Sequence, residues 1–322
     1  MSEDLLQRMI APELAAFAAL PRPDFSADLQ AFRQPFPQPP TPPEFAGVEC
    51  TERFVPGLSG APDVRLLHYA LPGERTSPRP ALLHIHGGGF ILGQPEMCDL
   101  ANRQWAAWLD CIVVSVDYRL APETPFPGAL QDCYAVLRWL HDNSAELGID
   151  RERIAIAGDS AGAGHAAALA IHARETGGPA IAFQMLDAPM LDDRTSDSAD
   201  PHPFCGHWVW TPEQNRFGWS ALLGDEGANA SPPQGAVPAR VQDLSGLPPA
   251  FISVGSLDLF LEENFEYARR LTRVGVPVEL HVIPGAFHGF GRVVDAPQAR
   301  QVVELKRQAL ARAFGIDRNA GG

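Results

Sequence analysis

The sequence predicts an α/β fold, in which helices cover both faces of a mostly parallel sheet. From about residue 48 onward, short apolar runs of strand length alternate with longer helix-like segments. Such alternation is typical of a parallel sheet entered through an antiparallel edge. A serine between glycines lies where one strand-like run meets one helix-like segment. The 322 residues suffice for one large domain with a smaller appendage.

The N-terminal segment does not share this alternation. Residues 5–20 carry apolar positions at helical spacing and predict a helix. Eight prolines follow between residues 21 and 43, and they forbid a regular helix or a central strand. We therefore expect residues 1–46 to form an arm and residues 47–322 to form the main domain.

The strands and helices of the main domain follow from apolar periodicity. Apolar runs of about four to eight residues predict strands, and longer segments with one apolar face predict helices. The predicted strands cover residues 64–71, 81–85, 111–116, 154–157, 181–186, 250–254 and 278–283. The predicted helices cover residues 100–109, 130–141, 161–173, 265–274 and 296–314. The last strand and the last helix offer an edge for a homodimer, and the sequence leaves the oligomeric state open.

One stretch, residues 190–247, breaks the alternation. It is rich in Pro, Asp, Gly and Ser, and a structureless loop of that length is uncommon inside a compact domain. We therefore expect an inserted lid, built on short helices and packed with the N-terminal arm. Five aromatic residues are candidates for the lining of an apolar substrate pocket: Phe90, Phe204, Trp208, Trp210 and Phe217. The alternative is that the lid aromatics form the lid's own core.

Charge and composition argue against several classes of partner. The formal net charge is −14 and the isoelectric point is about 5.1. Because no cluster of Lys and Arg offsets this charge, neither nucleic acid nor an anionic membrane is an expected partner. The acidic N-terminus is not followed by a leader-like segment, and the sequence has no run of about eighteen apolar residues. No membrane anchor is predicted.

The cysteines indicate a reducing compartment. Five are present, at Cys50, Cys98, Cys111, Cys133 and Cys205, and none lies in a C-x-x-C pair. An odd number with this spacing indicates neither a disulfide framework nor a zinc site. We expect buried thiols and a cytoplasmic protein.

The serine at the strand-helix junction is the candidate nucleophile. It lies in the run Gly158-Asp159-Ser160-Ala161-Gly162, between an apolar strand and an alanine-rich helix. The glycines suit a sharp turn, because strand and helix approach closely there and leave no room for a Cβ. The N–H of Ala161, at the head of the helix, would point toward an oxyanion formed at Ser160.

A second glycine run supplies the other half of this chemistry. Its residues, His86-Gly87-Gly88-Gly89-Phe90, directly follow a predicted strand. Backbone N–H groups in such a loop stabilise the oxyanion of acyl transfer. The serine hydroxyl still needs a general base, and the base needs a carboxylate that holds it in the right tautomer.

The base and the carboxylate are expected just after later strands, since ligands bind at the carboxyl ends of the strands in such sheets. Asp258 and His288 each follow a predicted strand, and glycines lie on both sides of His288. The order Ser160, Asp258, His288 is the order expected on this architecture. Glu262 is the alternative carboxylate, because an acidic residue after a strand often caps the next helix.

Three other histidines are assigned no chemistry. His84 and His86 form a His-x-His pair without a third ligand cluster in the sequence, so no metal is predicted. We expect His86 to hydrogen-bond the backbone and shape the glycine loop. His165, early in the helix after the nucleophile, is expected to pack as a neutral ring.

Together these motifs resemble the hormone-sensitive-lipase-like branch of the α/β-hydrolases, whose members are carboxylesterases and lipases. The resemblance spans about two thirds of the chain. It rests, in order, on residues 86–90, 117–123, 126–127, 158–162, 247–251, 258, 262–263 and 288–290. It implies the α/β-hydrolase fold, with a mostly parallel eight-stranded sheet and a helical cap made from the N-terminal arm and the mid-chain insertion.

The resemblance also implies roles for individual residues. In that family the second and third glycines of the loop and the residue after the serine form the oxyanion hole, which here means Gly88, Gly89 and Ala161. A triad of Ser160, His288 and Asp258 would then hydrolyse small-molecule esters without a cofactor.

Short to medium acyl chains are favoured, because nothing in the sequence indicates an interfacial lipid-binding surface. The alternatives are a lyase or dehydratase, an amidase, and a small-molecule receptor on the same scaffold.

The sequence departs from the family pattern at two places. Leu259 stands where proline usually follows the triad aspartate, and Ala163-Gly164-His165 replaces a common Gly-Asn-Leu run. We assign residues 117–123 a structural role, because Asp, Arg and Glu near a strand end can tie a loop through charge-assisted hydrogen bonds.

Overall fold

The computed structural model describes residues 3–21, 24–25, 27–34, 40–73, 75–227 and 231–316. Parts of the predicted arm, lid and main domain lie outside the described residues, namely 1–2, 22–23, 26, 35–39, 74, 228–230 and 317–322. Among the described residues, no helix combines the length and the apolarity that a membrane span requires.

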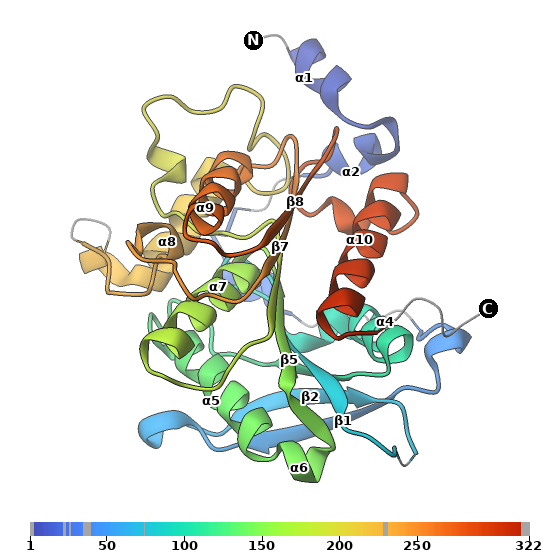
Figure 1. The fold of residues 1–322 in the computed structure, drawn as a ribbon. Helices are drawn as coiled ribbons and strands as arrows, with labels where there is room; N and C mark the ends of the chain where they lie inside the picture. The colour runs from blue at the N-terminus through green and yellow to red at the C-terminus, as the bar shows by residue number, and fades with distance from the viewer. Residues whose placement is uncertain are drawn as a thin grey trace.

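The part of the chain that the structure describes contains one sheet of eight strands, in the order β1-β2-β4-β3-β5-β6-β7-β8 (Figure 1). The strands are β1 (Glu49–Val55), β2 (Val64–Ala70), β3 (Arg79–Ile85), β4 (Ile112–Val116), β5 (Ile149–Asp159), β6 (Phe183–Asp187), β7 (Ala250–Gly255) and β8 (Val278–Ile283). Only β2 runs antiparallel to its neighbours, β1 and β4. The predicted fold class, with a mostly parallel sheet and an antiparallel edge, is confirmed.

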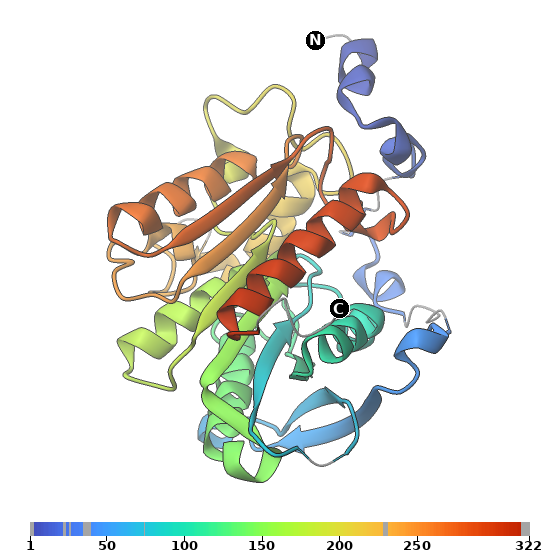
Figure 2. The same cartoon turned by 45° about the vertical axis from the view of Figure 1, so that its right-hand side comes forward.

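Helices cover both faces of this sheet (Figures 1 and 2). One face carries α4 (Asp99–Leu109) and α10 (Pro297–Ala313), and the other carries α5 (Gly128–Asp142), α7 (Ala161–Glu175) and α9 (Leu261–Arg273). The shorter helices α1 (Glu3–Met9), α2 (Ala15–Ala18), α3 (Leu29–Phe32) and α6 (Ser144–Leu147) and the lid helix α8 (Pro212–Gly227) lie outside these layers. Two large buried apolar clusters, one on each face, fill the space between helices and sheet.

The edge strand β1 lies outside the predicted strands. Most of its side chains are exposed, and an antiparallel edge strand needs no apolar run, because water covers its outer side. The start of β5 also lies outside the predicted strands, because β5 begins at Ile149 rather than at residue 154. The intervening residues 150–153 are polar and largely exposed.

The predicted helix over residues 5–20 is wrong in its continuity, because α1 and α2 are separate. Pro12 stands between them, and the residue before a proline avoids the helical region; Ala11 is extended, with φ −59° and ψ 131°. The N–H of Ala11 donates to the carbonyl oxygen of Gly285 at 3.0 Å. This bond attaches the arm to the loop that follows β8.

Residues 190–247 connect β6 to β7 and contain α8 with short 3₁₀ turns. The N-terminal arm packs against this insertion in two apolar clusters. One contains Leu14 and Trp208, and the other contains Phe25 and Trp210. The arm and the insertion therefore lie together at the carboxyl ends of the strands.

Candidate active site

Ser160 lies between the last residue of β5 and the first turn of α7, with φ 56° and ψ −121°. Residues with a side chain rarely adopt this backbone conformation. A Cβ on Gly158 would come within 2.4 Å of the backbone of Gly162, and a Cβ on Gly162 would come within 2.1 Å of the carbonyl oxygen of Ile85. The predicted lack of room for side chains on both sides of the turn is confirmed.

Three side chains from separate loops meet at this turn. Ser160 Oγ lies 2.9 Å from His288 Nε2, and His288 Nδ1 lies 2.9 Å from Asp258 Oδ2. Asp258 is 1% exposed and His288 is 7% exposed, so bulk water does not compete strongly for these hydrogen bonds. With its proton on Nδ1, the imidazole donates to the carboxylate and accepts from the serine hydroxyl. This arrangement can activate an alcohol as a nucleophile.

The structure places Asp258, and not Glu262, beside His288. Glu262 is exposed on α9. The second oxygen of Asp258 accepts the N–H of Phe260 at 3.0 Å, and the ring of Phe260 stands edge-on to the imidazole at 5.0 Å between centroids. The neighbouring Glu263 is buried and accepts the N–H of Leu191 at 2.7 Å, so it ties α9 to the start of the lid.

The loop that carries His288 turns at two glycines. Gly285 has φ 68° and Gly289 has φ 75°, and glycine adopts this region without strain. The carbonyl oxygen of Ala286 accepts the N–H of Leu257 at 2.9 Å. The loops of the imidazole and of the carboxylate are therefore joined by their backbones, which fixes the distance between the two groups.

The glycine loop lies directly against the nucleophile. A Cβ on Gly87 would come within 3.4 Å of Ser160 Cβ. Gly88 and Gly89 have φ of 136° and 60°, which again favours glycine. A Cβ on Gly89 would also come within 2.0 Å of the ring of Trp210. Backbone conformation and the packed lid therefore both require glycine here.

Two buried histidines, His86 and His165, contact residues of the glycine loop. His86 Nδ1 lies 2.9 Å from the carbonyl oxygen of Gly87, and the hydroxyl of Tyr118 donates to the carbonyl oxygen of His86 at 2.8 Å. His165 packs against Phe90 and Tyr118, with centroids 4.8 and 5.1 Å apart. Burial lowers the pKa of His86 to about 4 and that of His165 to about 3. Both rings are neutral at pH 7, and the structural roles predicted for them are confirmed.

The five aromatic pocket candidates fall into two buried clusters. Those that share a cluster with Ala161, beside the nucleophile, are Phe90, Trp210 and Phe217. Those that pack on the N-terminal arm instead are Phe204 and Trp208. Trp210 also faces the triad, with its ring 6.4 Å from that of His288. This placement favours the pocket hypothesis for Trp210, whereas Trp208 packs on the arm and on Phe287 rather than within a core of the lid's own.

Arg33 anchors the N-terminal arm beside the glycine loop. Its guanidinium donates to the carbonyl oxygens of Ile91 and Ala121, at 2.8 and 2.6 Å, and to the carboxylate of Glu123 at 2.7 Å. Its side chain is only 15% exposed. Sequence reasoning missed this anchor, because Arg33 stands in a proline-rich stretch without periodicity and no local pattern marks it.

Residues 117–123 have the structural role predicted for them. Arg65 donates to Asp117 at 3.0 Å. Arg119 forms a two-pronged contact with the buried Asp132, at 2.7 and 2.9 Å. Together with the ion pair between Glu123 and Arg33, these contacts fix the loop that follows β4.

A polar network behind the nucleophile, with Lys306 and His84 buried and Asp159 partly exposed, is a second feature that sequence reasoning missed. His84 Nε2 lies 3.2 Å from Asp159 Oδ2, and Lys306 Nζ lies 3.2 Å from Asp159 Oδ1. The ligand atoms of His84, Cys98 and Asp159 lie within 4.8 Å of one another. Because Lys306 and His84 already contact the two carboxylate oxygens of Asp159, the geometry favours an ion-pair network over a cation site. The available signal was the place of Lys306 in the apolar stripe of α10, beside Val302 and Leu310.

All five cysteines are unpaired. Cys111, Cys133 and Cys205 are buried as predicted, whereas Cys50 and Cys98 are half-buried. The prediction of buried thiols therefore holds for three of them. Burial raises the pKa of Cys111 and of Cys205 to about 12, so neither is a thiolate near neutral pH.

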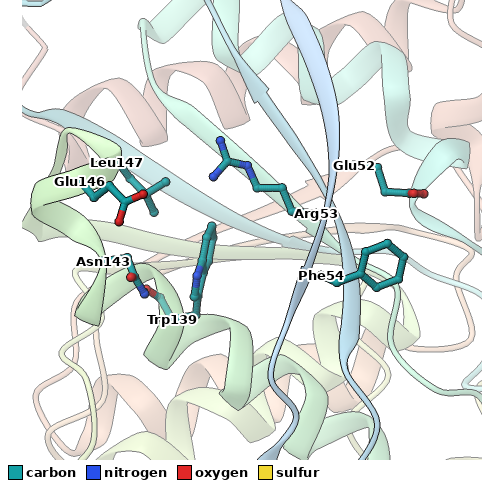
Figure 3. A pocket seen from close by; sticks show the side chains of 7 residues that line it. All are labelled: Glu52, Arg53, Phe54, Trp139, Asn143, Glu146 and Leu147. Carbon is teal, nitrogen blue, oxygen red and sulfur yellow. The ribbon is translucent and has the colours of Figure 1, made fainter.

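A groove of about 500 Å³ opens elsewhere on the surface, between β1 and the end of α5 (Figure 3). It is lined by Glu52, Arg53, Phe54, Trp139, Asn143, Glu146 and Leu147. Its helical wall includes α6, which precedes β5, whereas Ser160 follows β5. The length of β5 separates the two places, so the groove is not part of the site built on Ser160.

Comparison with known proteins finds one matching family, related sequences and similar solved structures. A family model described as the α/β hydrolase fold matches residues 82–292. The carboxylesterase NlhH of Mycobacterium tuberculosis is 36% identical over 293 residues, which cover 85% of this chain and 86% of the relative. The esterase LipI of the same organism is 33% identical over 280 residues, which cover 81% of each chain. Among solved structures, a bacterial heroin esterase has a TM-score of 0.87 at 38% identity, covering 95% of this chain and 98% of that one.

Proposed function

Because this chain belongs to the hormone-sensitive-lipase-like branch of the α/β-hydrolases and is a carboxylesterase, we propose that it cleaves esters through an acyl-enzyme on Ser160. The observation that carries the proposal is the continuous hydrogen-bonded line from Ser160 through His288 to Asp258, with both distances at 2.9 Å. Such a line gives a serine the base and the oriented imidazole that nucleophilic attack requires.

In the first half of the proposed cycle, Ser160 Oγ attacks the carbonyl carbon of the ester while His288 Nε2 takes the hydroxyl proton. Asp258 stabilises the imidazolium that results. The C–O bond to the alcohol then breaks, and the alcohol leaves with the proton from His288. The product of this half is an ester between the acyl group and Ser160.

The oxyanion of each tetrahedral intermediate would accept hydrogen bonds from the backbone N–H groups of Gly88, Gly89 and Ala161. The close approach of the glycine loop to Ser160 supports this assignment. The N-terminus of α7 adds its positive dipole end at the same point. Donors held in place before the reaction stabilise developing charge without a cost of reorganisation.

In the second half, water attacks the acyl-enzyme while His288 takes one of its protons. The bond to Oγ breaks, the proton returns to Ser160, and a carboxylic acid leaves. Substrate, water and the three side chains supply every proton and electron pair, so the proposed cycle requires neither a metal nor a cofactor.

Small-molecule esters with short to medium acyl chains are the proposed substrates. The apolar cluster beside Ser160 closes over the site from three parts of the chain, with Phe25 from the arm, Trp210 from the lid and Phe260 from the acid loop. Such an enclosure suits a compact acyl group better than a long chain. The five unpaired cysteines support the proposed cytoplasmic location.

Labelling with a serine-reactive phosphonate tests the nucleophile directly. We expect the wild type to gain the mass of one phosphonyl group, on the peptide that contains Ser160, and the Ser160→Ala variant to gain none. Ser220→Ala, at an exposed position of α8, is the control and should label like the wild type. Folded wild type that does not label, or equal labelling of Ser160→Ala, contradicts the proposal.

A further inference from the structure

The C-terminal helix α10 places one ammonium group directly behind the nucleophile. Lys306 Nζ lies 3.2 Å from Asp159 Oδ1 and also contacts Asp187 Oδ2. The Lys306 side chain is 9% exposed. Moving an ammonium out of water is costly unless carboxylates pair with it, and here two do.

These two carboxylates flank the backbone of the nucleophile. Asp159 and Asp187 are the last residues of β5 and β6, and they are direct partners in the register of the two strands. Asp159 precedes Ser160 in the chain. The carbonyl oxygen of Asp187 accepts the N–H of Ser160 at 2.8 Å. Lys306 therefore ties together the two residues that hold the Ser160 backbone.

The network reaches the neighbouring strands as well. Ser253, in β7, donates its hydroxyl to Asp187 Oδ1 at 2.6 Å, and β7 leads to Asp258. His84, in β3, lies 3.2 Å from Asp159 Oδ2, and β3 leads into the glycine loop. One ion network thus joins β3, β5, β6 and β7, which are adjacent in the sheet, and these strands carry the glycine loop, the nucleophile and the acid.

The backbone of Ser160 needs such support, because its φ of 56° and ψ of −121° are strained. A strained conformation persists only where its surroundings fix it. Without the ammonium, the carboxylates of Asp159 and Asp187 would repel each other at the ends of paired strands. The strand ends could then separate, and Ser160 Oγ would move away from His288.

We propose that Lys306 is a positioning residue for the nucleophile. Through Asp159 and Asp187 it holds Ser160 in the conformation in which the hydroxyl faces His288. This inference rests on the proposed function of Ser160.

The test is Lys306→Met, which keeps much of the side-chain volume and removes the charge. We expect kcat for p-nitrophenyl acetate to fall by about 10- to 100-fold, with KM changed by less than about threefold, since a small displacement of a reacting group slows the chemical step more than binding. The rate is expressed per active site titrated with phosphonate, at a temperature where circular dichroism shows the variant folded.

The matched control is Arg307→Met, one residue further along α10. Arg307 is paired with Glu304 on the exposed side of the helix, so this variant also loses a cation and an ion pair but touches neither Asp159 nor Asp187. We expect its kcat to stay within about twofold of the wild type. The double variant Lys306→Met/Asp187→Asn removes the repulsion along with the ammonium, and should regain at least about threefold of the lost kcat, because the two sites are coupled.

A lysine that only stabilises the fold would lower the melting temperature and leave kcat per active site unchanged, and that result overturns the inference. If Lys306→Met does not fold, the inference is tested with Asp187→Asn instead. It is expected to lower kcat at least about threefold, and an unchanged kcat overturns the inference. Wild type without Ser160-dependent hydrolysis would instead overturn the proposed function, so the two failures are distinguishable.

Discussion

The ring of Trp210 occupies the space that a side chain on Gly89 would need, with a ring carbon 2.0 Å from the position of a Cβ. Trp210 belongs to the lid, and Gly89 belongs to the loop proposed to bind the oxyanion. The insertion between β6 and β7 therefore lies in direct contact with the glycine loop. Trp210 packs against the backbone of a residue proposed to bind the oxyanion, and we expect this contact to restrain the glycine loop.

Gly89→Ala is therefore expected to lower kcat about 100-fold or more, which is the usual cost of losing one oxyanion donor. The added methyl group must displace either the loop or Trp210. Steady-state kinetics on p-nitrophenyl acetate measures the effect. Gly177→Ala is the control, because Gly177 has the same φ of 60° but no atom within 4 Å of a Cβ. Equal losses of kcat in the two variants would contradict the role of Gly89.

Arg33→Ala is expected to loosen the arm. The variant loses three hydrogen bonds to the loops around the site, so the free energy of unfolding should fall by about 1–3 kcal/mol. Since Phe25 of the arm packs on Trp210 at 6.0 Å, KM should rise and the preferred acyl chain should lengthen. Urea unfolding and a series of p-nitrophenyl esters measure both effects.

The control for the arm is Arg8→Ala, which removes an exposed pair with Asp4 in α1 and should cost less than about 1 kcal/mol. An Arg33→Ala variant with the stability and the chain-length profile of the wild type would show that the arm is not anchored by this contact.

His165→Leu is expected to make stability less dependent on pH. Burial lowers the pKa of His165 from 6.5 to about 3, so between these values the unfolded chain binds a proton that the folded protein does not. Stability therefore falls as the pH drops through this window. The loss of free energy of unfolding between pH 7 and pH 5 should be about 2 kcal/mol smaller in the variant. Urea unfolding at both pH values gives this difference, and identical losses in the two proteins would contradict the neutral buried ring.

Asp258→Asn is expected to lower kcat by about 10⁴-fold with little change in stability, because the amide keeps the volume but no longer stabilises the imidazolium or fixes its tautomer. Glu262→Gln, at an exposed position of α9, is the control and should leave kcat within about twofold. A larger loss in Glu262→Gln than in Asp258→Asn would reverse the assignment of the carboxylate.

The predictable parts of the site are those whose chemistry requires particular residue types at fixed positions within a short stretch of sequence. A nucleophile on a strained turn needs glycines at fixed offsets, and a base loop at a strand end needs flanking glycines. Ser160, His288 and the glycine loop therefore stand out within a few residues of sequence. Asp258 follows from its place after β7 and from the chain order.

The rest depends on contacts between distant parts of the chain. Arg33 meets Glu123, and Lys306 meets Asp159, across intervals that carry no repeating pattern. The division of the lid aromatics into two clusters depends on where the arm docks, and the polar edge strand β1 has no apolar run to reveal it. A charged residue within an apolar helix stripe, as at Lys306, is the one local sign that such a contact leaves.

The most direct test of the account compares wild type and Ser160→Ala in the hydrolysis of p-nitrophenyl esters from acetate to palmitate at pH 8. We expect the wild type to prefer short to medium acyl chains and Ser160→Ala to lose on the order of a millionfold in turnover, because the triad acts as one unit. A folded wild type that cleaves none of these esters, or a Ser160→Ala variant of comparable activity, would contradict the central claim that Ser160 is the nucleophile of an esterase.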